Sequence, residues 1–127
     1  MTRFRFIWMV LGLLAATAAA SADVAGLPAP MDSRRLLERS EDANGTHLKT
    51  TVTRVTLPAG YKTPLHTHES PGPRYVLKGR LKVEESGKSQ VYEAGSAFWE
   101  SGQWMTAENV GEGVVELLIV EINAGPR

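Results

Sequence analysis

The stretch "AGYKTPLHTHESPGPRYVLKG", residues 59–79, holds two of the three histidines of this chain, one residue apart. Pro64 comes just before them and disfavours a continuing helix, so extended backbone is expected at His66 and His68. Residues two apart in a strand project to the same face. Both imidazoles can then hold one divalent ion if another strand supplies further ligands. The same pair is also compatible with two polar histidines satisfied by solvent or backbone.

Segments on both sides of this stretch have the composition of short strands. They are rich in β-branched residues or alternate apolar with polar residues, and glycine or proline lies at their joints: residues 46–57, 74–85, 90–100, 101–113 and 114–122. The last segment is apolar on both parities, which indicates a strand covered on both faces and favours a homodimer. Residues 31–40 fit either a short helix capped by Asp32 or a strand. Many short strands predict an antiparallel β-sandwich or barrel.

The first 22 residues have the pattern of a secretory signal peptide. Arg3 and Arg5 precede an apolar run, and small residues end the segment at Ala22. The run is shorter than the roughly 20 residues of a bilayer span, although an uncleaved anchor is the alternative. We therefore expect an exported protein, periplasmic or secreted, without membrane attachment after cleavage. Its predicted organisation is a signal peptide (1–22), an extended leader (23–34) and one β-barrel domain (35–127).

The charge balance excludes some classes of partner. The chain has 14 basic and 14 acidic residues, and two of the basic ones fall in the signal segment, so the mature chain is slightly acidic. No basic patch indicates binding to nucleic acid or to an anionic membrane surface. The chain also lacks cysteine, so stability has to come from a packed core, with oligomerisation or a metal as further sources.

The glycine spacing around the histidine pair gives it a family context. Gly60, five intervening residues, His66-x-His68 and then Gly79 resemble the first sequence motif of the cupin superfamily. Residues 92–111 resemble the second motif, which has a glycine, a short strand, a turn, a histidine and an asparagine four residues later. Its landmarks here are Gly95, Gly102 and Asn109, with one residue fewer before the turn. The resemblance implies an all-β jelly-roll barrel of the small, single-domain, quercetin-dioxygenase-like type.

The resemblance implies a metal site less completely than it implies the fold. Metal-binding cupins usually supply three histidines and one glutamate from these motifs, and here only His66 and His68 match. Gly72 stands where the glutamate is expected, and Met105 stands where the third histidine is expected.

Other residues are candidates to complete the site. Glu69 follows the pair directly, and Glu100 shares the parity of Phe98, so either carboxylate would give two imidazoles the donor set of a facial triad. The thioether of Met105 would suit copper instead. The ordinary alternatives are a loop carboxylate for Glu69, a rim carboxylate for Glu100 and a core side chain for Met105. The ions under consideration are iron, manganese, nickel, zinc and copper.

Two functions are compatible with this sequence. The first is a cupin that binds a metal ion or a small molecule in its barrel, with oxygenase-like or isomerase-like activity in which Glu69 or Glu100 is ligand or base. The second is a non-catalytic ligand-binding or sensor barrel without metal. Arg74 could pair with a ligand carboxylate or remain at the surface. Aromatic residues could line the pocket or only pack the core: Tyr75, Tyr92, Phe98, Trp99 and Trp104.

Overall fold

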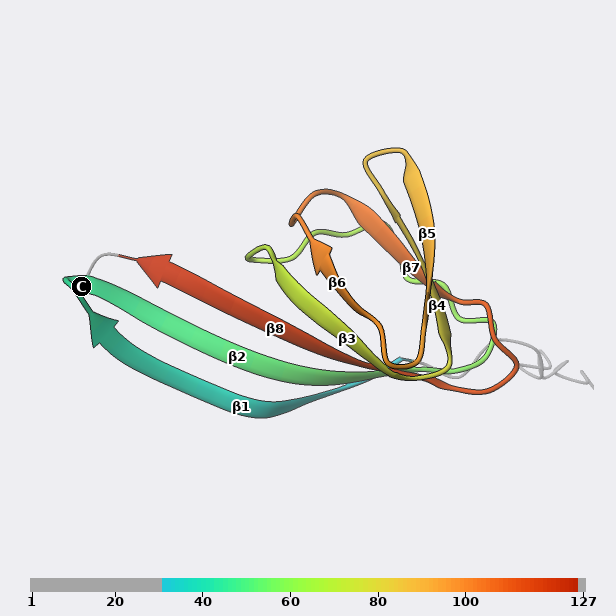
Figure 1. Ribbon diagram of the computed structural model, residues 1–127, viewed down its shortest axis with the longest axis horizontal. Coiled ribbons are helices and arrows are strands. Elements are labelled where there is room, and N and C mark those ends of the chain that lie inside the picture. The colour runs from blue at the N-terminus through green and yellow to red at the C-terminus, as the bar shows by residue number, and fades with distance from the viewer. Residues whose placement is uncertain (1–30, 126–127) are drawn as a thin grey trace, which may run out of the picture.

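A computed structural model describes residues 31–125, which form an antiparallel all-β fold, as predicted (Figure 1). Its strands are β1 (Asp32–Ala43), β2 (Thr46–Leu57), β3 (Gly72–Lys78), β4 (Arg80–Glu85), β5 (Lys88–Glu93), β6 (Ala97–Glu100), β7 (Met105–Asn109) and β8 (Val115–Gly125). The predicted signal peptide and most of the predicted leader lie outside the described residues. Within residues 31–125, no helix is long and apolar enough to span a bilayer.

The strands form two sheets that enclose the core. The five-stranded sheet has the order β1-β2-β8-β3-β6, and the three-stranded sheet has the order β5-β4-β7. In Figure 1 the smaller sheet stands at a steep angle to the larger one, and the far halves of β1, β2 and β8 extend beyond both as a ribbon. Apolar side chains from both sheets fill the space where they meet; the most buried are Leu57, Val76, Leu81, Met105 and Val115.

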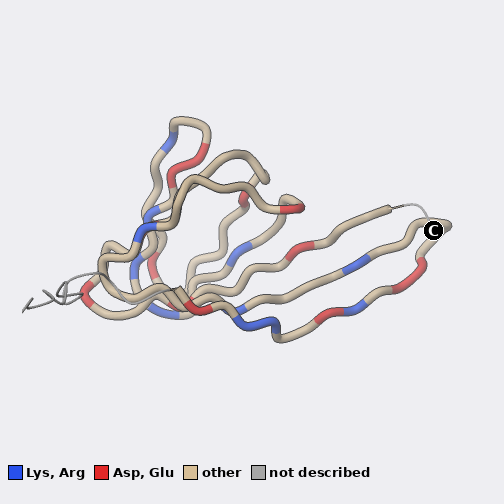
Figure 2. Tube along the Cα trace, turned by 180° about the vertical axis from the view of Figure 1, so that it is seen from behind, with Lys and Arg blue, Asp and Glu red and all other residues tan. Residues whose placement is uncertain are grey.

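The segment that fitted either a helix or a strand forms β1. Its ladder with β2 begins at Asp32, so residues 32–34, which the sequence placed in the leader, belong to the sheet. The strand is exposed over most of its length, and basic and acidic residues are mixed along it (Figure 2). Arg39 pairs with Glu41 at 3.1 Å. Charged side chains of this kind limit the pairing of an exposed edge strand with other chains.

The odd-numbered apolar residues within residues 74–85 face outward before Gly79 and inward after it. Leu81 and Val83 in β4 are buried, but Tyr75 and Leu77 in β3 are 42% and 40% exposed. The cause is a register shift at the end of β3 together with Gly79, whose φ of +84° is costly for other residues. The inward residues of β3 are therefore its even-numbered ones.

The outer face of the five-stranded sheet carries apolar side chains. In the ladders Leu37 lies opposite Val52, Val52 lies opposite Val120, and Tyr75 lies opposite Leu118. Directly opposed residues share a face, and none of these residues lines the interior pocket described below. On β8, two residues after Val120, Ile122 is 52% exposed. The homodimer that the sequence predicts would cover this apolar face. The homodimer itself stays a prediction.

The asparagine of the second motif ties three segments together. Asn109 is buried, and its Nδ2 donates to the backbone oxygens of Leu57 and Gly113 at 2.9 and 2.8 Å. Its Oδ1 accepts a hydrogen bond from the Gly111 amide at 3.0 Å. One side chain thus satisfies the ends of β2 and β7 and the turn that precedes β8. This explains why an amide, with both donors and an acceptor, suits the position.

Candidate functional site

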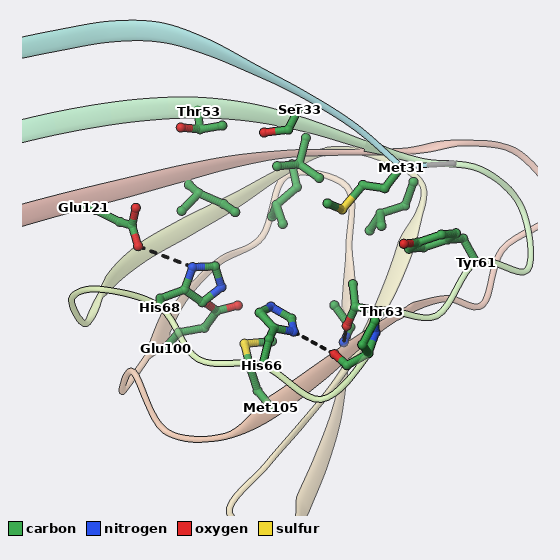
Figure 3. Close-up of a pocket in the computed structure, with 16 residues that line it drawn as sticks. Met31, Ser33, Thr53, Tyr61, Thr63, His66, His68, Glu100, Met105 and Glu121 are labelled. Atoms are coloured by element: carbon green, nitrogen blue, oxygen red, sulfur yellow. Dashed lines mark hydrogen bonds and ion pairs between the residues drawn. The ribbon is translucent and has the colours of Figure 1, made fainter. Parts of the chain in front are cut away.

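A pocket of about 330 Å³ opens between the two sheets (Figure 3). One wall is apolar and is formed mainly by inward side chains of β2 and β8, among them Val55, Leu57, Leu117 and Ile119. The other end is polar and contains His66, His68, Glu100 and Glu121. We call these four residues the polar end of the pocket. The volume and the mixed lining are typical of a site for a small organic molecule.

The two histidines project into the pocket together, as their spacing predicts. Their ring centroids are 5.1 Å apart, in an edge-to-face arrangement. The Nδ1 atom of His66 lies 2.8 Å from the carbonyl oxygen of Pro64. Because a carbonyl only accepts, Nδ1 carries a proton, and in the neutral imidazole Nε2 then has the lone pair. The proline that predicts extended backbone here therefore also fixes the tautomer of the first histidine.

Met105, which stands at the expected place of a third histidine, lies directly across from His66. The two residues exchange backbone hydrogen bonds of 3.0 and 2.9 Å in an isolated antiparallel bridge. The sulfur of Met105 lies beside the His66 ring in Figure 3, and the side chain is only 1% exposed. Met105 thus lines the pocket and is also part of the hydrophobic core.

Glu100 enters the pocket from β6 and is held by Arg74 of β3. In the β3–β6 ladder Glu100 lies opposite Gly72, so a carboxylate comes from the strand beside the position that lacks one. The Nε of Arg74 donates to Oε2 of Glu100 at 2.7 Å, and Nη1 donates to the backbone oxygen of Val120 at 2.8 Å. Both residues are at least 98% buried. This ion pair is neither of the roles that the sequence indicated for Arg74.

His68 lies between two carboxylates. Its Nε2 is 3.3 Å from Oε2 of Glu100, and its Nδ1 is 3.3 Å from Oε1 of Glu121. Burial lowers the pKa of His68 below its usual value of 6.5, and the positive charge of Arg74 lowers it further. Glu100 and Glu121 act in the opposite direction without reversing the shift. The neutral imidazole is therefore the form of His68 near neutral pH.

This lowered pKa predicts a pH dependence of stability. As the pH falls below about 6.5, the unfolded chain takes up a proton on His68 that the folded chain resists, so the free energy of unfolding decreases. Above that pH the contribution is fully present. Urea unfolding between about pH 7.5 and pH 5 should show a shallower loss of stability in His68→Gln than in the native protein. The control is His47→Gln, at a position far from the pocket. Equal slopes in the native protein and in His68→Gln would contradict the prediction.

The structure does not bring Glu69 to the histidines. Its side chain is exposed, and its Oε2 accepts a hydrogen bond from the Asn123 amide at 3.4 Å. The aromatic residues that could either line a pocket or pack the core do not line this pocket. Tyr92 and Phe98 stack on each other with centroids 4.0 Å apart, and Trp99 and Trp104 are more than 60% exposed.

Tyr61 and Glu121 are among the pocket residues that the sequence analysis did not single out. Tyr61 lies just after the first motif glycine, and Glu121 lies within the apolar run of β8. Glu121 shares the parity of Leu117 and Ile119, which face the pocket, and this parity was the signal that could have located it.

Comparison with known proteins identifies the family. The cupin domain model matches residues 53–121, which is more than half of the chain. The chain belongs to the cupin family. A search of curated proteins found no significant match.

Solved cupin structures share this fold. The cupin domain of an XRE family transcriptional regulator from Enterobacter cloacae is 16% identical with a TM-score of 0.60, over 76% of this chain and 98% of that one. The Schizosaccharomyces pombe Cnp3 cupin domain is 15% identical with a TM-score of 0.56, over 76% and 65%. An RmlC-like cupin with a double-stranded β-helix from Methanocaldococcus jannaschii is 18% identical with a TM-score of 0.52, over 67% and 79%. Such low identities show a common fold alone.

Cupins commonly bind metals, but the residues of this cupin do not fit such a site well. Within residues 31–125, no three His, Cys, Asp or Glu side chains are grouped in a way that could hold an ion. Glu100 is already paired with the guanidinium of Arg74, and both ring nitrogens of His68 face carboxylates. Met105 replaces an imidazole with a thioether. Of the two predicted imidazole ligands, only His66 has a ring nitrogen, Nε2, that does not face a carboxylate.

Proposed function

We propose that this cupin is exported and binds one small organic molecule in the pocket between its sheets, without a metal ion. The observation that carries the proposal is the pocket itself, whose apolar wall faces four converging polar side chains within about 330 Å³. Such a combination can bury the body of a ligand and orient its polar group. The proposal of export rests on the signal-peptide pattern of residues 1–22.

The arrangement supports binding better than metal-dependent oxygenation. An oxygenase-like reaction of the kind that the resemblance implies needs an ion with open positions, held by several free donors. Here Arg74 already engages Oε2 of Glu100, and within residues 31–125 no three carboxylate or imidazole side chains are grouped to hold an ion. We therefore assign no chemical step to His66, His68 or Glu100, and we give them the role of ligand recognition.

The proposal predicts that a substitution filling the pocket abolishes binding. Prodan, a small neutral dye whose fluorescence rises in apolar surroundings, should bind the native protein once per chain. Ile119→Trp places a large side chain in the pocket and should lower the affinity for the dye by at least about 10-fold. Leu118→Trp is the matched control, because Leu118 is the neighbouring residue of β8 and does not line the pocket. This control should bind the dye like the native protein.

Two results would overturn the proposal. The first is dye binding that is unchanged in Ile119→Trp and in a second filled variant, Thr53→Phe, once circular dichroism shows that both are folded. The second is a stoichiometric metal in the purified native protein, found by elemental analysis and lost in His66→Ala. That second result would support the metal-binding cupin instead.

A further inference from the structure

The ionisable side chains that line the pocket are acidic groups and histidines. Glu100 and Glu121 contribute two carboxylates, and no lysine or arginine is among the lining residues. Arg74 lies behind Glu100 with its side chain fully buried, so it offsets one negative charge without reaching the cavity surface. The two glutamates and Arg74 together have a net charge of about −1.

The carboxylates also have unused capacity to accept hydrogen bonds. Oε2 of Glu100 is engaged by Arg74, but within residues 31–125 its Oε1 accepts no hydrogen bond, although the residue is only 2% exposed. Oε1 of Glu121 lies 3.3 Å from Nδ1 of His68, and Nη2 of Arg74 is 4.0 Å from the same oxygen, which is too far for a hydrogen bond. A buried carboxylate with open acceptor positions is costly unless a donor is supplied. Water can supply these donors while the pocket is empty, and a ligand that displaces the water has to bring donors of its own.

We propose that the molecule bound in this pocket is a small organic cation, an apolar body that carries a protonated amine. The ammonium group would lie among Glu100, Glu121 and Nε2 of His66, and it can donate hydrogen bonds to these acceptors. The apolar body would lie against Val55 and Leu117 on the opposite wall. This inference rests on the proposed function, because it names the chemical class of the ligand.

The same charges select against anionic ligands. A carboxylate or phosphate would face two carboxylates of the protein, and no cation in the lining would compensate it. An alcohol of the same shape would fit but would leave the negative charge uncompensated.

Three probes that differ only in their head group test this inference. 2-Phenylethylamine, 2-phenylethanol and phenylacetate share a ring and are a cation, a neutral molecule and an anion near neutral pH. Their affinities are measured by calorimetry and by competition with prodan. We expect the amine to bind at least about 10-fold more tightly than the alcohol, and the carboxylate to bind most weakly.

A charge-neutralising variant locates the effect. Glu121→Gln should lower the affinity for the amine by about 10-fold and change that for the alcohol by less than about 2-fold, since only the amine uses the charge. Glu69→Gln is the matched control, because it removes the same charge from an exposed site that does not line the pocket. It should leave all three affinities unchanged.

Distinct results separate the failure of this inference from the failure of the proposed function. Three results would overturn the inference that the ligand is a cation: equal affinities for the amine and the alcohol, tighter binding of the carboxylate, or an unchanged affinity for the amine in Glu121→Gln. In each case prodan binding would still support the pocket as a binding site. Binding of prodan with no binding of any of the three probes would do the same. Binding of none of the four molecules would overturn both.

Discussion

Arg74→Met is expected to destabilise this cupin by about 3–5 kcal/mol, the cost of leaving a buried carboxylate without its partner. The guanidinium holds Glu100 through a 2.7 Å hydrogen bond and satisfies the Val120 carbonyl at 2.8 Å. Both partners are largely shielded from water, because Arg74 is 1% and Glu100 is 2% exposed. Urea unfolding followed by circular dichroism measures the difference in the free energy of unfolding.

Two further variants test whether the loss comes from the unpaired charge. Arg80→Met breaks an ion pair of the same kind, in which Nε of Arg80 lies 2.8 Å from Oε1 of Glu93. In this pair more than half of each side chain is exposed. It should cost less than about 1 kcal/mol. The double variant Arg74→Met/Glu100→Leu removes both charges and should recover most of the stability. A loss in Arg74→Met as small as that in Arg80→Met would contradict this account.

Much of the fold could be predicted from the sequence because its signals are local. The β-branched run of β2, the break at Gly79 and the glycine spacing around His66 each depend on a few neighbouring residues. The side of β3 that faces inward could not be predicted in the same way. A glycine with positive φ and a register shift reverse the parity there, and neither is visible in an alternation pattern.

Site residues could be predicted where their spacing along the chain alone decides to which side their side chains point. His66 and His68 share a side, and Glu100 is buried like Phe98. Arg74 was unexpected, because a charged residue on a strand usually points to solvent, and its burial depends on a carboxylate from β6, 26 residues later. Glu69 could not be placed, because its direction depends on the bend at residues 69–70, just before β3. Contacts between distant strands therefore decided the part of the site that the sequence left open.

Gly72→Ala is expected to destabilise the fold by about 1–3 kcal/mol, although it adds only a methyl group. A Cβ at this position would lie 2.4 Å from the backbone oxygen of Val120 and 3.2 Å from Nη1 of Arg74. The Val120 oxygen belongs to the central strand β8 and cannot move without disturbing the sheet. The backbone of Val120 therefore excludes the glutamate that the cupin motif expects here, and Arg74 narrows the space further. Urea unfolding of the variant measures the loss.

Gly113→Ala is the matched control, because a Cβ there would have no neighbour within 4 Å and the residue does not need a positive φ. It should change the free energy of unfolding by less than about 0.5 kcal/mol. The clash at Gly72 should also be relieved in part when Arg74 is shortened, so the losses in Gly72→Ala and Arg74→Met should sum to more than the loss in the double variant. Strict additivity would mean that Val120 alone excludes a side chain at Gly72, and that Arg74 has no part in closing this position to the glutamate of other cupins.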